Sequence, residues 1–528
     1  MDSVAEMPGA GPIGRVIAVQ GGTVLVQLDA PGAASAVLIG DLVTTATSAG
    51  RSFGLVHALR QGRRAEDRPM AEVQLLGELV EGDEGRTRFR RGTSACPALD
   101  SELRRATVAE AAAIYAAPEA AHVCIGRLRQ EPGLPANLAT DALLGRHFAI
   151  LGSTGSGKSC AVTVVLRALL DVAPYAHIVL IDPHNEYGAA FGARALRLDP
   201  SNLELPYWLL TFEEIAAILT PGDGARAYAE AAILREAVLR AKQLYAGEAP
   251  DRSQISVDTP VPYRLSDLER AIEDAMGTLN KPEAAAAYRH LLARVAAVRE
   301  DRRYAFMFQS FVLRDNLDAI LGRLLRIPVG DRPITLLDIS GVPSEIVNVV
   351  VSVMCRVIFE FGLWAEPNRR LPLLLVCEEA HRYVPSDGMQ AFEPARRAID
   401  RIAKEGRKYG VALCLVSQRP SELSPSSLSQ CGTILALRLS NDRDLAYVRD
   451  VMPDGFDWLV RELPSLATGE AVVVGQAVAV PQQIRLSDLP IDHQPASQTP
   501  PFAAAWSQDH PDPDLLARTV HRWRRQLR

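Results

Sequence analysis

The stretch HFAILGSTGSGKSC, residues 147–160, decides the fold class of this chain. Its apolar residues FAIL are typical of a buried strand, and the segment GSTGSGKS (152–159) that follows fits the phosphate-binding pattern G-x-x-x-x-G-K-[ST]. Glycines let backbone N–H groups turn inward onto phosphate oxygens, with the positive end of a helix behind them. The pattern predicts a strand, a nucleotide-binding loop and a helix. The alternative is a glycine-rich loop without a ligand, which the flanking strand and helix disfavour.

The residues of this loop have different expected roles. We expect Lys158 to reach the β- and γ-phosphates of ATP and Ser159 to bind Mg²⁺. The residues expected to surround the phosphates are Gly152, Ser153, Thr154, Gly155, Ser156, Gly157, Lys158, Ser159 and Cys160.

Composition limits the function classes only loosely. The chain has 528 residues, which suggests about three domains, and its 48% hydrophobic and 23% charged residues are those of an ordinary globular protein. A formal net charge of −6 gives no overall nucleic-acid signature, so any contact with a polyanion depends on a local basic face or a pore.

Cysteines and apolar segments favour a cytoplasmic protein. The seven cysteines form no C-x-x-C pair and mostly lie in apolar runs, as reduced core residues do. The N-terminal segment lacks the basic and apolar regions of a signal peptide. Four polar or charged residues interrupt the apolar stretch 347–364, which favours a buried helix over a membrane span.

Short apolar runs after residue 147 predict a parallel sheet. A helix is expected over 158–170 and a strand over 177–182, and further apolar strands are expected over 334–340, 371–379, 411–418 and 432–439. Nearly continuous apolar strands separated by helices are typical of a parallel sheet that is buried on both faces. The fold class is therefore α/β, with a RecA-like P-loop core.

The remaining pattern divides the chain into five parts. Valine- and isoleucine-rich runs with a Gly21-Gly22 hairpin signal predict a small β-barrel, although an independent ligand-binding sandwich fits the same pattern. A helix is expected over 101–117 and a hairpin-like pair of strands over 471–486. The parts are an N-terminal β-barrel (1–96), a connecting region (97–140), the core (141–206 and 326–490), an inserted helical subdomain (207–325) and a C-terminal tail with a basic end (491–528).

Polar residues follow two of the predicted core strands. Glu378 and Glu379 come after LLLVC, where one carboxylate would hold Mg²⁺ through water and the other would act as general base. Gln418 ends the next strand, where its amide can sense the γ-phosphate or orient water. The alternatives are an acidic pair that only begins a helix and a glutamine that only bonds its own turn.

Three arginines are candidates for neutralising charge in the transition state: Arg146, Arg407 and Arg438. Each also fits an ordinary helix-cap or salt-bridge arginine. Asp182 and His184, in IDPHNEYG (181–188), are candidates to line the nucleotide or substrate side of the sheet. A metal site there is not expected, because no second histidine lies at ligand spacing.

Together the segments GSTGSGKS, IDPHNEYG, LLLVCEEAHRYVP and the string from Arg401 to Asp442 resemble the HerA-type hexameric DNA translocases of the HerA/FtsK superfamily. The resemblance covers nearly the whole chain, and the 401–442 string is more specific than the phosphate-binding loop. The sequence departs from the family pattern at Glu378, where aspartate is common.

The resemblance implies an ATPase that requires ATP and Mg²⁺, forms a homohexameric ring and moves along double-stranded DNA through a central pore. It implies nucleotide chemistry for Lys158, Ser159, Glu378 and Glu379, with Gln418 as sensor. By position, Arg146 would act across the subunit interface and Arg407 would contact nucleotide.

Relatives of this kind work with a second protein docked on the barrel face. The resemblance therefore implies an effector, such as a NurA-like nuclease, a SIR2-type NADase or another nuclease, in DNA-end processing or antiphage defence; no membrane partner is implied. Two alternatives are an ATP-regulated hexameric scaffold that assembles and gates such an effector, and a protein-remodelling ATPase.

Overall fold

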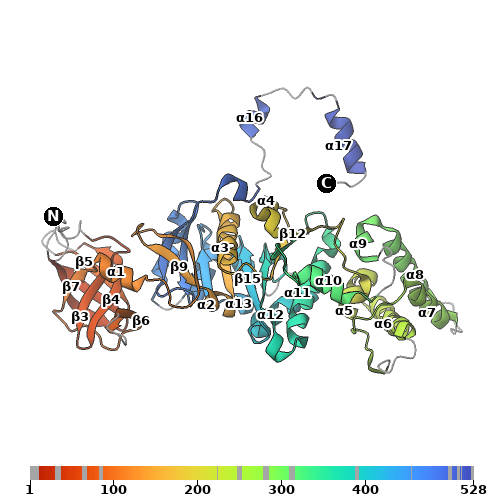
Figure 1. Ribbon diagram of the computed structural model, residues 1–528, viewed down its shortest axis with the longest axis horizontal. Helices are drawn as coiled ribbons and strands as arrows, with labels where there is room; N and C mark the ends of the chain where they lie inside the picture. The colour runs from red at the N-terminus through yellow and green to blue at the C-terminus, as the bar shows by residue number, and fades with distance from the viewer. Residues whose placement is uncertain are drawn as a thin grey trace.

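The computed structural model is elongated, with a β-barrel at one end, a large sheet in the middle and a helical region at the other end (Figure 1). It describes residues 11–524 apart from 30–36, 62–67, 82–86, 223, 247–252, 278–284, 309–314, 387–391, 453–454, 497–501, 508–511 and 513. The last four residues of the predicted basic tail lie outside this range.

The N-terminal sheet is antiparallel and closes on itself. Its strand order is β2-β1-β7-β3-β4-β5-β6, and an additional pairing of β2 with β5 closes six of the strands into a barrel, with β6 added beside β5. Side chains of alternate residues, such as Val24, Val26 and Leu28 on β2, fill its interior. The strands are β1 (Pro12–Gln20), β2 (Thr23–Leu28), β3 (Leu42–Thr47), β4 (Gly50–Arg60), β5 (Met70–Glu81), β6 (Thr87–Arg91) and β7 (Glu102–Arg105).

The second sheet has eleven strands and confirms the predicted parallel core. Its order is β12-β13-β11-β14-β15-β10-β16-β17-β18-β8-β9, and the strands from β12 to β16 in that order are parallel. These seven strands are β10 (Phe148–Leu151), β11 (Ile178–Asp182), β12 (Ala195–Leu198), β13 (Ile334–Asp338), β14 (Leu373–Cys377), β15 (Val411–Ser417) and β16 (Thr433–Ala436).

Four antiparallel strands extend one side of this sheet. The expected hairpin forms β17 (Glu470–Gly475) and β18 (Gln482–Leu486). The region read as a connection contributes β8 (His122–Leu128) and β9 (Pro135–Ala139), and β8 pairs with β18. The prediction of a helix over 101–117 was wrong for its first residues. Glu102–Arg105 form β7, which pairs with β1 and β3, and helix α1 spans only Val108–Ile114.

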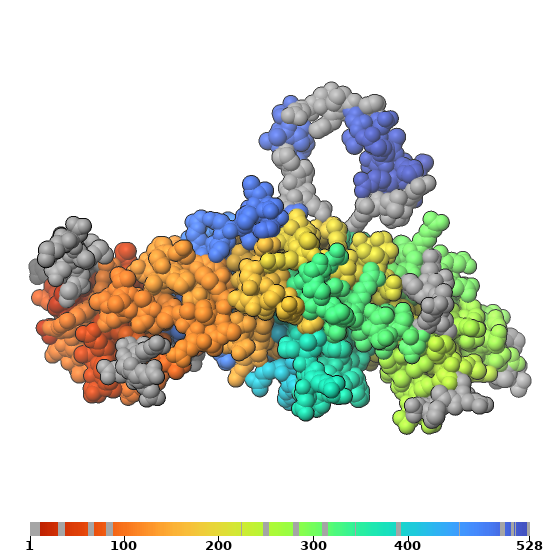
Figure 2. Space-filling model, in the orientation of Figure 1, coloured from red at the N-terminus to blue at the C-terminus, as the bar shows by residue number. Residues whose placement is uncertain are grey.

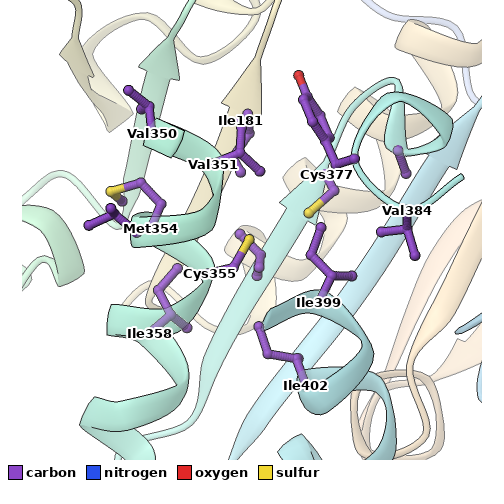
Figure 3. Packing of buried hydrophobic residues seen from close by; sticks show 14 of the residues in the cluster. Ile181, Val350, Val351, Met354, Cys355, Ile358, Cys377, Val384, Ile399 and Ile402 are labelled. Carbon is purple, nitrogen blue, oxygen red and sulfur yellow. The ribbon is translucent and has the colours of Figure 1, made fainter. Parts of the chain in front are cut away.

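Helices cover both faces of the parallel sheet, as the apolar strands predict. On β10, Phe148 and Ile150 pack toward α3 (Lys158–Val172), whereas Ala149 and Leu151 belong to the cluster on the opposite face. That face carries α11 (Ser344–Trp364) and α12 (Glu393–Glu405). Figure 3 shows Cys355 of α11 and Ile399 of α12 beside Cys377 of β14.

The apolar segment 347–364 is part of α11 and is a core helix, as predicted. Within the described ranges one helical segment, Glu345–Trp364, is long and apolar enough to cross a membrane, and 72% of its most apolar window is buried inside the protein.

The helical insertion lies between β12 and β13. The helices that the structure describes there are α5 (Phe212–Leu219), α6 (Ala225–Ala246), α7 (Leu265–Gly277), α8 (Ala285–Glu300), α9 (Ala305–Phe308) and α10 (Leu317–Leu325). At the C-terminal end, α16 (Phe502–Trp506) and α17 (Leu515–Arg524) stand away from the rest of the protein in Figure 2. The shorter helices elsewhere are α2 (Thr140–Gly145), α4 (Gly188–Phe191), α13 (Pro425–Leu428), α14 (Asp442–Val451) and α15 (Trp458–Glu462).

Candidate active site

Four parallel strands end side by side at one edge of the sheet. Leu151 is paired with Ser417, and Cys377 is paired with both Ile181 and Leu415. The residues that follow β10, β11, β14 and β15 therefore meet at this edge. Ligands of open parallel sheets bind at the carboxyl ends of the strands, which makes this edge the candidate site.

The phosphate-binding loop has the backbone conformation that its glycines allow. Gly155 and Gly157 have φ angles of +75° and +96°, in the left-handed region. Helix α3 begins at Lys158, directly after Gly157. A glycine-rich turn that runs directly into the first turn of a helix is the arrangement that binds phosphate.

Arg438 supports the loop from behind. Its backbone carbonyl accepts hydrogen bonds from the N–H and the hydroxyl of Ser153, both at 2.9 Å. Its guanidinium donates to the carbonyl oxygen of Gly155 at 3.2 Å. Of the three candidate arginines, Arg438 is therefore tied to the shape of the loop.

Lys158 lies between the two predicted carboxylates. Its Nζ is 3.1 Å from Oε1 of Glu379 and 3.4 Å from Oε2 of Glu378, and all three side chains are nearly buried. Burial alone would lower the pKa of Lys158, but the two carboxylates raise it above its ordinary value. Burial raises the pKa of Glu378, against the opposing effect of the Lys158 charge. The lysine is thus held as a cation in the place where phosphate oxygens would meet it.

Glu379 is fixed by its neighbours and by its backbone. It has a φ of +52°, unusual for a residue with a side chain. The amide of Gln418 donates to Glu379 Oε2 at 3.0 Å, and the hydroxyl of Thr154 donates to the Gln418 side-chain oxygen at 2.6 Å. His381 lies 3.4 Å from the same carboxylate and 3.2 Å from the hydroxyl of Ser417. The network links Glu379 to the phosphate-binding loop through Gln418.

The segment after β11 has a role that sequence reasoning only partly anticipated. The Asp182 carboxylate accepts hydrogen bonds from the backbone N–H groups of His184, Glu186 and Tyr187, so it closes a turn. Two residues not predicted as site residues then reach the site. Glu186 accepts a hydrogen bond from the Ser159 hydroxyl at 2.8 Å, and the Tyr187 hydroxyl donates to Glu378. Their only sequence signal was a polar turn after a core strand.

The structure does not bring Arg146 or Arg407 to this edge. Both are exposed and precede the first residues of β10 and β15, at the amino edge of the sheet. Six residues of extended chain, from Arg146 to Gly152, span about 20 Å. Burial lowers the pKa of His147, with the charge of Arg407 as a lesser cause, so both arginines adjoin this histidine. Neither guanidinium has a hydrogen-bond or ion-pair partner among the described residues.

The residues at the carboxyl edge fit a magnesium–nucleotide complex. The hydroxyl of Ser159 and the carboxylate of Glu378 are hard oxygen donors of the kind that Mg²⁺ prefers. Mg²⁺ is commonly held by one or two such groups together with substrate phosphates. The part of the chain that the structure describes has no group of three or more His, Cys, Asp or Glu residues placed to hold a metal.

The parallel sheet, the phosphate-binding loop and the acidic pair define a P-loop ATPase. Residues 123–358 match the family model described as "Helicase HerA, central domain". The DNA double-strand break repair helicase HerA of Pyrococcus furiosus is 27% identical over 465 residues, covering 79% of this chain and 77% of the relative. A probable DNA double-strand break repair helicase HerA of Methanocaldococcus jannaschii is 28% identical over 418 residues, covering 71% and 77%.

A solved structure has a similar fold. VirB4 of Thermoanaerobacter pseudethanolicus matches with a TM-score of 0.50 and 16% identity, over 72% of this chain and all of that one. The matching region, residues 123–358, and the two relatives make this chain similar to HerA helicases, and VirB4 shares its fold.

Proposed function

We propose that the protein is an ATP-driven translocase, of the helicase type, that acts on double-stranded DNA. The observation that carries the proposal is the network from Lys158 through Glu379 and Gln418 to Thr154, since it joins a phosphate-binding cation, a general base and a polar sensor. The names of the relatives support the DNA substrate, because both are described as DNA double-strand break repair helicases.

In the proposed reaction each residue has one task. Lys158 would leave the two glutamates and bind the β- and γ-phosphates, and Ser159 and Glu378 would hold Mg²⁺. Glu379 accepts a proton from the attacking water. Gln418, which is hydrogen-bonded to Glu379, senses whether the γ-phosphate is present. When bound there, Mg²⁺ would supply positive charge to the phosphate oxygens.

The two exposed arginines support a ring. Arg146 and Arg407 lie at the edge of the sheet opposite the phosphate-binding loop, which supports a role at a nucleotide other than that of their own subunit. An arginine supplied by a neighbouring subunit stabilises transition-state charge. We propose a homohexamer in which Arg146 and Arg407 reach the neighbour's nucleotide.

DNA would be contacted by local basic surfaces. Helix α12 buries Ala395, Ile399 and Ile402 and exposes Arg397, Arg401 and Lys404, which supports a role for that face near DNA or a neighbouring subunit. Binding to phosphates through such residues is independent of sequence and sensitive to salt.

We further propose that the protein is cytoplasmic and that its barrel docks a separate effector, a nuclease or an NADase, in DNA-end processing or antiphage defence. Exposed apolar side chains on the barrel domain, such as Leu38 and Ile39, support the docking.

The test is the rate of ATP hydrolysis with Mg²⁺, with and without duplex DNA. We expect duplex DNA to stimulate hydrolysis and Lys158→Ala or Glu379→Gln to abolish it. An exposed ion pair away from α12 provides matched controls: Arg369→Ala and Glu366→Gln should hydrolyse ATP like the wild type. Full hydrolysis in both site variants would contradict the site, and stimulation by unfolded protein in place of DNA would contradict the substrate.

A further inference from the structure

The turn after β11 brings two side chains against predicted magnesium ligands. Asp182 is buried and its two carboxylate oxygens accept three backbone hydrogen bonds at 3.1–3.2 Å, from residues 184, 186 and 187. The turn therefore has a fixed shape, and Asp182 has little capacity left to bind a ligand. Its consequence is the placement of Glu186 and Tyr187.

Glu186 determines the direction of one hydrogen atom. The Ser159 hydroxyl donates its hydrogen to the Glu186 carboxylate at 2.8 Å. A hydroxyl has one hydrogen and two acceptor lone pairs, so a hydrogen directed at Glu186 leaves the lone pairs to face a cation. Without Glu186 the hydroxyl is free to rotate and to point its hydrogen toward the cation.

Tyr187 acts on the other predicted ligand in a similar way. Its side chain is completely buried, its ring is stacked on Phe191, and its hydroxyl donates to Oε1 of Glu378. The other oxygen of Glu378 accepts the backbone N–H of Glu379 and faces Lys158. The longer side chain of Glu378, in place of the more usual aspartate, is thereby held in one orientation.

We propose that Glu186 and Tyr187 are positioning residues of the magnesium site: Glu186 orients the Ser159 hydroxyl and Tyr187 orients the Glu378 carboxylate. The proposal rests on the proposed function, because it assigns residues to the same magnesium–nucleotide complex. Groups that orient the ligands of a metal typically change its affinity by about 10- to 100-fold when they are removed.

The experiment measures ADP binding by calorimetry, first in EDTA and then at increasing Mg²⁺ concentration. The readout is the Mg²⁺ concentration that gives half of the metal-dependent change in ADP affinity. We expect this concentration to rise about 10- to 100-fold in Glu186→Ala and in Tyr187→Phe, with ADP binding in EDTA little changed. Glu186→Gln keeps an oxygen that can accept the hydroxyl hydrogen and should show a much smaller rise.

Two further variants complete the design. Asp171→Asn changes an exposed carboxylate on the last turn of the same helix, α3, and should match the wild type. In a Ser159→Ala background, Glu186→Ala should have no further effect, because the hydroxyl that it orients is gone. Thermal unfolding of each variant checks that the fold is intact; if Glu186→Ala fails to fold, Tyr187→Phe and Glu186→Gln carry the test.

Two results would overturn the proposal. One is an unchanged half-effective Mg²⁺ concentration in folded Glu186→Ala and Tyr187→Phe. The other is an equal rise in Glu186→Ala and Glu186→Gln, which would mean that charge and not orientation matters. If the wild type shows no Mg²⁺-dependent ADP binding at all, the proposed function itself fails, which is a distinguishable outcome.

Discussion

Replacing Lys158 with methionine should destabilise the protein without nucleotide, because the lysine is the cation between two buried carboxylates. The side chains of Lys158, Glu378 and Glu379 are 10%, 4% and 5% exposed. Removing one partner of a buried ion pair costs about 3–5 kcal/mol. The alternative for the variant is to protonate one glutamate, which at a pH three units above its ordinary pKa costs about 4 kcal/mol. Both estimates of the loss in folding stability therefore have the same magnitude.

The assay is thermal unfolding of the nucleotide-free protein, following the transition of the P-loop core. For a unit of about 150–250 residues, 1 kcal/mol shifts the midpoint by about 2–4 °C, so Lys158→Met should lower it by on the order of 10 °C. Lys404→Met, at an exposed position on α12, is the matched control and should stay within about 0.5 kcal/mol of the wild type.

The pH dependence of this difference has a definite sign. The folded pKa of Lys158 is raised, so its contribution is fully present below the ordinary lysine pKa of about 10.4 and is constant at neutral pH. The folded pKa of Glu378 is also raised, which lowers stability above the ordinary glutamate pKa, and losing Lys158 raises it further. The deficit of Lys158→Met should therefore shrink as the pH falls toward about 4.3. If Lys158→Met is as stable as the wild type at neutral pH, Lys158 does not stabilise the two buried carboxylates.

The remaining predictions concern catalysis and assembly. Glu379→Gln should bind ATP but lose about 10²- to 10⁴-fold in hydrolysis, as expected for a general base; equal loss of binding, by calorimetry, would contradict that role. Arg146→Ala should lose hydrolysis and regain part of it when mixed with Lys158→Ala, because mixed interfaces restore complete sites; no regain in rings shown to be mixed would contradict action across the interface. If a ring neutralises six to ten phosphates, raising salt from 50 to 200 mM should weaken duplex binding about 10³- to 10⁵-fold in an anisotropy titration, and a flat response would argue against phosphate contacts.

Much of the fold was predictable because its signals are local. The loop 152–159 carries its glycines and lysine at fixed spacing, and each central strand is a short apolar run. Both could therefore be predicted from the local sequence, without knowing which distant segments pack against them. The segment Glu102–Arg105 was predicted as part of a helix. It forms a strand instead, because it pairs with β1 and β3. Pairing between distant segments overrides local preference.

The site followed the same rule. Glu378, Glu379 and Gln418 directly follow apolar strands, and Lys158 ends the loop that follows another. The shared carboxyl edge of a parallel sheet therefore predicted that they lie close together. Glu186 was not predicted, because its position beside Ser159 depends on a turn that Asp182 closes through backbone hydrogen bonds.

Displacement of a third strand from a DNA triplex measures movement along duplex DNA, since a protein that moves along the duplex removes the third strand ahead of it. We expect the wild type to displace the strand only with ATP and Mg²⁺, and Glu379→Gln to displace none. If the wild type hydrolyses ATP at the same rate with and without duplex DNA and displaces no third strand, it is not a DNA translocase.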